Sequence, residues 1–230
     1  MLGFYRIINL VPALRAIISE ESLIPKNNQN KIPFLFKTLK LLLFAKKNKN
    51  TDLSKTLRKL GPTWIKLGQF LSTRPDIIGR DLSDKLKNLQ DKVEPFTIAR
   101  AKEILQNEFK EDYKNIFIEI MPSETAASIA QVHKGKVKLN NKKYDVAIKI
   151  LRPNIEKEIK RDLKNFFVAA KLIERFSKEA KRLRLIEIVK TLAESLSMEI
   201  DLRLEAAAQS EIRENVINDD YFNVPDVYWD

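Results

Sequence analysis

The feature that most constrains the fold is a change of hydrophobic period in the middle of a mostly helical chain. The stretches 116–120, 128–139 and 144–150 alternate apolar and polar residues, as half-buried strands do. Asn140 and Asn141 separate the last two stretches, and two asparagines suit the tight turn of a hairpin. On either side, apolar residues recur at helical spacing. We therefore expect an α+β fold with a small antiparallel sheet.

Helices are expected both before and after this sheet. From residue 52 the pattern is helical in pieces, and Gly61-Pro62 breaks the first piece while Pro62 suits an early helical position. Trp64, Leu67, Phe70 and Leu71 then define an apolar face, and Pro75 ends that helix. Further helices are predicted at 81–90, 97–109, 154–178 and 183–213, with another strand beginning at 221–229.

Composition excludes several classes of protein. The 32% of charged residues argue against full integration into a membrane, and 44% hydrophobic residues suffice for a core. It has no cysteine, so disulfide frameworks and thiolate metal sites are excluded. The single histidine, His133, excludes multi-histidine metal clusters and is expected to make a structural hydrogen bond.

Positive charge is concentrated at the front of the chain. Of a net charge of +11, residues 1–50 carry nine Lys or Arg and only two Glu. This asymmetry predicts attraction to lipid headgroups or to nucleic acid, although a solvated basic face is the simpler alternative. Residues 1–18 and 33–45 are apolar but interrupted by Lys or Arg, so neither spans a bilayer. Each fits an interfacial amphipathic helix, or equally a helix packed on the protein body.

Residues 146–149, Val-Ala-Ile-Lys, suggest a nucleotide site. Alternate residues of a strand share a face, so Ala147 and Lys149 point the same way. The small alanine would admit a flat adenine, and the lysine would reach the phosphates, as on the third strand of kinases. The same four residues also describe a half-buried strand with a solvated lysine.

A phosphate-binding lysine needs a carboxylate from a helix to hold it in place. The helix predicted at 183–213 offers Glu199, Asp201 and Glu205. If that helix is unbroken, Asp201 and Glu205 share a face while Glu199 points nearly opposite Asp201, so Glu199 and Asp201 should have different partners. A charged helix surface is the alternative.

The chain has only five glycines and no glycine-rich phosphate loop before the lysine strand. Residues 125–135, TAASIAQVHKG, stand in its place, and their small side chains would still allow close approach of the backbone to phosphates. This segment and VAIKILRP, preceded by LGPTWIKLGQFLSTRPD and followed by MEIDLRLEAAAQ, closely resemble the UbiB/ADCK family of atypical kinase-like proteins. Four motifs in order, from about residue 52 onward, carry the resemblance.

The resemblance implies a role for each motif. Lys149 would bind the α- and β-phosphates, and Glu205 would be its partner on the helix. Lys66 and Gln69 would belong to an added helical segment over the usual protein-substrate site, where Glu199 and Asp201 would meet it. The residues implied around the nucleotide are Thr125, Ala126, Ala127, Ser128, Ala130, Val132, Ala147 and Lys149. Thr125 departs from the family pattern, in which alanine or a comparably small residue is usual at this position. A β-branched residue there would crowd the phosphates.

The implied fold is a kinase-like N-lobe, made of a small antiparallel sheet plus a long helix, behind a helical extension. We expect a basic membrane-proximal segment at 1–50, the extension at 51–114 and the lobe at 115–230. The catalytic loop and the D-F-G segment are not found in these 230 residues, so the ligands for Mg²⁺ with ATP or ADP would lie outside them. We expect weak nucleotide binding and no turnover from the chain alone.

The expected function is that of the N-terminal part of a UbiB-type kinase or ATPase supporting ubiquinone biosynthesis. The expected place is the cytoplasmic face of the inner membrane, in a bacterium rather than a mitochondrion. Expected partners are nucleotide, an anionic membrane surface, quinone-biosynthesis proteins and isoprenoid lipid precursors. The alternatives are a non-catalytic membrane-associated scaffold and a nucleic-acid binder, and no RNP-type or helix-turn-helix signature supports the latter.

Overall fold

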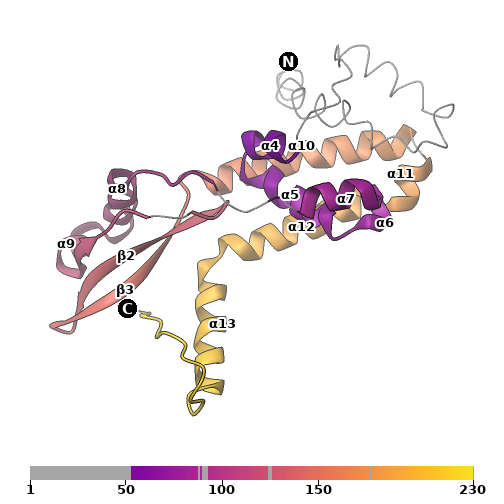
Figure 1. The fold of residues 1–230 in the computed structure, drawn as a ribbon. Helices are drawn as coiled ribbons and strands as arrows, with labels where there is room; N and C mark the ends of the chain where they lie inside the picture. Colours follow the sequence, from indigo (N-terminus) through magenta and orange to yellow (C-terminus); the bar gives the residue numbers. More distant parts are fainter. Residues whose placement is uncertain (1–52, 88, 90–92, 124–125, 177, 230) are drawn as a thin grey trace.

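The fold was obtained as a computed structural model, which describes residues 53–87, 89, 93–123, 126–176 and 178–229 (Figure 1). The expected basic membrane-proximal segment at 1–50 lies outside these residues, as does Thr125. The described part is α+β, with one small sheet at one end and a layer of helices beside it. The expected fold class is therefore confirmed.

The sheet has three antiparallel strands in the order β1 (Phe117–Ile120), β2 (Ala130–Leu139) and β3 (Lys142–Leu151). The β2–β3 hairpin is confirmed at the predicted turn. Asn140 and Asn141 take φ values of 49° and 63°, a left-handed pair that asparagine tolerates and that matches the twist of the strands.

Along β2, alternate side chains are buried or exposed, so the sheet has an inner and an outer face. The inner face packs on α8 (Ile98–Phe109), a predicted helix that begins at a Thr97 cap. Ala101 and Leu105 of α8 meet Ile120 and Ile150 of the sheet in a small core. A single 3₁₀ turn (Lys110–Asp112) and α9 (Tyr113–Ile116) lead from α8 into β1. The outer face of β2 and β3 is left open.

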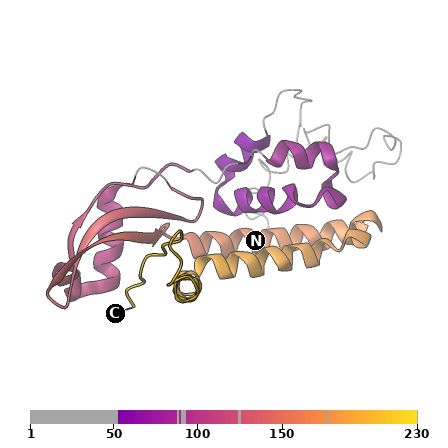
Figure 2. The ribbon, with the colours of Figure 1, turned by 60° about the horizontal axis from the view of Figure 1, so that its bottom comes forward.

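A second core joins two helical layers, seen one above the other in Figure 2. The first layer contains α4 (Leu53–Leu60), α5 (Pro62–Ser72), α6 (Pro75–Ile78) and α7 (Arg80–Lys87). The second contains α10 (Ile155–Phe176) and α12 (Leu185–Ile200), linked by α11 (Lys178–Leu183). Trp64 of α5 meets Phe166 of α10 edge to face, with ring centroids 4.7 Å apart. The interpretation of Trp64 as a core residue is confirmed.

Close packing explains the glycine between Lys66 and Gln69. A Cβ on Gly68 would lie 2.6 Å from Leu89 Cδ2 and 2.8 Å from Leu57 Cδ1. Those distances are well inside van der Waals contact, so a Cβ here would force the two leucine side chains to shift, and glycine lets α5 lie this close to them.

Two predicted elements are wrong. The helix expected at 183–213 is broken at Arg184, with φ 55°, and again at Asp201, where α13 (Leu202–Asn215) begins in a new direction (Figure 1). The stretch 221–229 forms no strand; it runs beside β3, with the Tyr228 ring 5.2 Å from the Tyr144 ring. Within the described part of the chain, no helix is both long and apolar enough to cross a bilayer.

Candidate nucleotide site

The outer face of the hairpin brings together three residues of the expected nucleotide site. Val132 of β2 lies directly opposite Lys149 of β3, and Lys134 lies opposite Ala147. Residues paired in this way share a face, so Val132, Ala147 and Lys149 form one exposed patch. Val132 is 46% exposed, although it is a β-branched apolar residue on a strand. The patch is therefore small and open, and each of its two apolar side chains lies opposite an exposed lysine, Val132 opposite Lys149 and Ala147 opposite Lys134.

Lys149 has the helix-borne carboxylate that a phosphate-binding lysine would need. Its Nζ donates to both carboxylate oxygens of Glu205, at 2.6 Å to Oε1. The two side chains are 37% and 55% exposed, so the pair contributes at most about 1 kcal/mol to stability. Its consequence is geometric, because the carboxylate fixes where the ammonium group lies.

The break at Asp201 lets Glu205 reach the strand. Asp201 ends α12 with ψ 89°, and its Oδ1 accepts a hydrogen bond from the Arg203 backbone N–H at the start of α13. The Arg203 guanidinium also donates to both oxygens of Asp201, and these hydrogen bonds lower the pKa of that carboxyl. The resemblance implied that Asp201 meets the α5 segment, but its hydrogen bonds go to Arg203.

Glu199, two residues before the break, pairs with Lys66 of α5. The Lys66 side chain is 16% exposed and that of Glu199 is 35% exposed, so this pair is better shielded from water than Lys149–Glu205. Glu199 and Asp201 do have different partners, as predicted, although the reason is the break and not the opposite faces of one helix.

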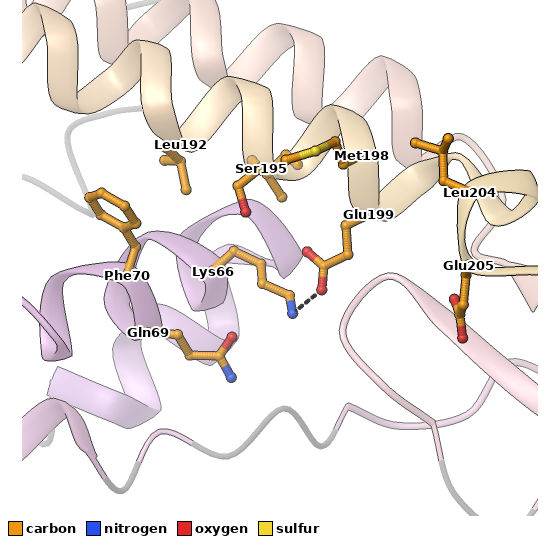
Figure 3. Close-up of a pocket in the computed structure, with 10 residues that line it drawn as sticks. Lys66, Gln69, Phe70, Leu192, Ser195, Met198, Glu199, Leu204 and Glu205 are labelled. Atoms are coloured by element: carbon orange, nitrogen blue, oxygen red, sulfur yellow. Dashed lines mark hydrogen bonds and ion pairs between the residues drawn. The ribbon is translucent and has the colours of Figure 1, made fainter. Parts of the chain in front are cut away.

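A pocket of about 560 Å³ is lined by residues of α5, α12 and α13 (Figure 3). The Lys66–Glu199 pair crosses it, and Glu205 stands at its edge, so both ion pairs border one space. Gln69 also lines it and donates from Nε2 to the Leu89 carbonyl at 3.4 Å. Phe70, expected to be core, is only partly buried and lines the pocket too. The apolar part of the wall comes from Phe70, Leu192, Leu196, Met198 and Leu204.

The alanine-rich loop folds back tightly on the start of β2. Ala127 N–H donates to the Ala130 carbonyl at 2.9 Å, and Arg152 Nε donates to the Ala127 carbonyl. Of the loop residues named for nucleotide binding that the structure describes, only Ala127 has an exposed side chain; Ala126, Ser128 and Ala130 are buried. Buried side chains cannot face a ligand on the outer face, so contacts from those positions would come from the backbone.

Sequence reasoning missed a buried polar network beneath the site. Gln131 accepts from the Phe96 N–H at 2.9 Å and donates to the Phe96 carbonyl at 3.1 Å. Its Nε2 also lies 2.8 Å from His133 Nε2, and His133 Nδ1 lies 2.8 Å from the Met121 carbonyl. These partners assign the proton to Nδ1. The structural interpretation of His133 is confirmed, whereas an amide in a strand gave no signal that Gln131 would be buried.

The described residues include no group of three acidic or histidine side chains that could hold a metal ion.

Comparison with known proteins identifies the family of the chain. The family model for the ABC1 atypical kinase-like domain matches residues 88–230. A probable protein kinase UbiB of Vibrio cholerae is 36% identical over 218 residues, covering 91% of this chain and 39% of the relative. Those of Marinobacter nauticus and Shewanella baltica are 37% and 38% identical over 201 and 203 residues, covering 87% and 85% of this chain and 36% and 37% of each relative. The chain thus spans well under half the length of these relatives.

Proposed function

The chain belongs to the ABC1 atypical kinase-like family, and on that premise we propose that its hairpin and α13 bind Mg-nucleotide as part of a UbiB-type kinase or ATPase. The observation that carries the proposal is the Lys149–Glu205 ion pair beside the open patch of Val132 and Ala147. An ammonium group held in place can bind the phosphates of a nucleotide, and the small apolar surface beside it can contact the base.

In this role each side chain has one task. Lys149 Nζ holds the α- and β-phosphate oxygens, and Glu205 keeps that ammonium group in position. Ala147 leaves room for a flat base, and Val132 packs against one side of it. The donor set fits the group, since Lys149, Ala147 and Val132 share one face while the large apolar side chains of β3 point inward. The bound Mg-nucleotide would supply a transferable phosphoryl group.

The position of α5 limits which phosphoryl acceptors could reach the site. Lys66 is joined to Glu199, so α5 is held across the pocket that also borders Glu205. A helix in this place leaves little room for a protein substrate, which favours ATP hydrolysis or a small lipid-like acceptor. The relatives named UbiB support a role in ubiquinone biosynthesis. We extend the proposal to the cytoplasmic face of the inner membrane, with quinone-biosynthesis proteins and isoprenoid precursors as partners.

The test is MgADP binding measured by titration calorimetry on the chain and on matched variants. Lys149→Ala should weaken binding about tenfold to a hundredfold, since one charge-assisted hydrogen bond contributes about 1.5–3 kcal/mol. Glu205→Gln should weaken it severalfold by releasing the lysine. Lys143→Ala, on the same strand and face but about 20 Å away by the strand rise, should bind as the unmodified chain does.

Two results would contradict the proposal. One is unchanged MgADP affinity in Lys149→Ala, and the other is an equal loss in Lys149→Ala and Lys143→Ala. Vesicle binding that persists in Lys149→Ala, with no effect of nucleotide on the thermal unfolding of any variant, would favour the non-catalytic scaffold instead.

A further inference from the structure

The far end of the β2–β3 hairpin carries lysines that the nucleotide site does not use. Lys138 and Lys143 lie directly opposite each other, and Lys142 is the first residue of β3 after the turn. All three side chains are exposed. Because paired residues share a face and neighbours alternate, Lys138 and Lys143 lie on the outer face and Lys142 on the inner one. The tip is thus cationic on both sides.

The pairing of β2 with β3 does not require lysines opposite each other. Like charges placed directly opposite on an antiparallel pair destabilise it. Within the described residues, Lys138, Lys142 and Lys143 form no ion pair, and Lys136 farther along β2 has only a long contact of 3.7 Å to Glu119. The hairpin projects from the rest of the molecule (Figures 1 and 2), so these three exposed lysines at its end are suited to an anionic partner outside the chain.

The tip lies well away from the nucleotide patch. Lys138 is six residues from Val132 along β2, and Lys143 is six residues from Lys149 along β3. At about 3.3 Å per residue this separation is roughly 20 Å. A partner at the tip can therefore bind while the outer face near Lys149 stays open.

Aromatic side chains beside the tip indicate which class of anionic partner it would bind. Tyr144 lies two residues from Lys142, and the Tyr228 ring is 5.2 Å from it. Trp229 follows and is 59% exposed. Tyrosine and tryptophan favour the boundary between lipid headgroups and acyl chains, because an apolar ring carries one polar group. Cations together with such rings suit an anionic lipid surface.

We propose that the tip of the β2–β3 hairpin, with Tyr228 and Trp229 beside it, docks on anionic lipid headgroups. The proposed function includes association with a membrane, and this contact would be the place in the described part of the chain where that association occurs. The inference rests on the proposed membrane association alone. It does not depend on nucleotide binding. At the surface the lysines lie among the headgroup phosphates and the rings at the depth of the glycerol groups.

The experiment is flotation of the chain with vesicles of phosphatidylcholine containing about 30% phosphatidylglycerol, so that anionic lipid is present. The test variant carries Lys138→Gln, Lys142→Gln and Lys143→Gln. Its matched control removes the same charge from exposed lysines of α10, by Lys157→Gln, Lys164→Gln and Lys171→Gln. Because residues 1–50 are also basic, the quantity to compare is the ratio of the two partition coefficients.

The tip variant should partition about a hundredfold less than the unmodified chain, since each lysine near an anionic surface contributes about fivefold. The control should lose much less. Tryptophan emission should shift to the blue on vesicle binding through Trp229, because Trp64 is buried throughout. MgADP affinity should be equal in both variants, so failure of this proposal and failure of the nucleotide site are separate results.

Equal losses in the tip and control variants would overturn the proposal, as would an unchanged partition of the tip variant. Lysine-dependent binding to duplex DNA without binding to vesicles would also overturn it, by assigning the tip to nucleic acid.

Discussion

The Lys66–Glu199 ion pair offers the sharpest test of how α5 is held. Lys66→Met keeps the aliphatic stem and removes the ammonium group, which leaves Glu199 half-buried without its partner. An exposed pair contributes up to about 1 kcal/mol, and breaking a fully buried one costs about 3–5 kcal/mol. With Lys66 16% exposed and Glu199 35% exposed, the expected loss of unfolding free energy is about 2 kcal/mol, between these limits.

A double-mutant cycle isolates the pair itself. Glu199→Gln alone should also destabilise, and the Lys66→Met/Glu199→Gln double variant should recover about 1 kcal/mol relative to the sum of the two, as contacting residues do. Urea unfolding followed by fluorescence suits the measurement, because Trp64 sits on the same helix and packs against Phe166 in the core. Exposed Trp229 adds a nearly constant background.

The reasoning would be refuted by a loss below about 0.5 kcal/mol in Lys66→Met together with no coupling in the cycle, since that is the behaviour of an exposed pair. α5 would then be held by its apolar face alone. A change of less than about 2 °C in thermal midpoint would give the same answer, because about 2 kcal/mol corresponds to roughly 4–8 °C in a chain of this size.

Three further outcomes are expected. Gly68→Ala should destabilise by about 1–3 kcal/mol in urea unfolding, because its Cβ would overlap two leucine side chains. Gln131→Leu should cost about 2–3 kcal/mol by leaving the Phe96 N–H and carbonyl without partners, whereas Gln106→Leu on the exposed side of α8 should be near neutral. Burial, reinforced by a neighbouring carboxylate, raises the pKa of Glu158, so its contribution to stability is present below its unfolded pKa and is lost as the pH rises through the folded pKa. Glu158→Gln should therefore be more stable than the unmodified chain at neutral pH and equal to it in acid, and parallel stability–pH curves for the two proteins would contradict this.

Local patterns were sufficient to predict the sheet. The alternation in 128–139 and 144–150, with two asparagines between, identified β2, β3 and their turn, because strand period and turn chemistry are short-range properties. The partnership of Lys149 with Glu205 came from the family resemblance, since a spacing of 56 residues has no local signature.

Long-range geometry accounts for what the sequence did not reveal. Leu, Ala and Glu continue on both sides of Asp201, so the helical pattern hides the break, although aspartate is a favoured N-cap. Ser128 looked like a loop residue facing a ligand and is buried by the turn back into β2. Tertiary contacts determine both the helix break at Asp201 and the burial of Ser128. Such contacts do not change the spacing of apolar residues, so the sequence pattern did not reveal them.

The break at Asp201 also makes the spacing between the two carboxylates intolerant of change. Glu199 and Glu205 lie on opposite sides of the break, and each forms an ion pair with a different lysine. One residue inserted after Asp201 would rotate Glu205 by about 100° around the axis of α13 and advance it by about 1.5 Å. It would then point away from β3 while Glu199 kept its place. The six-residue interval from Glu199 to Glu205 therefore has to match the Lys66 pair and the Lys149 pair at the same time. An insertion or deletion within it would uncouple α5 from β3, although every side chain of both ion pairs would still be present.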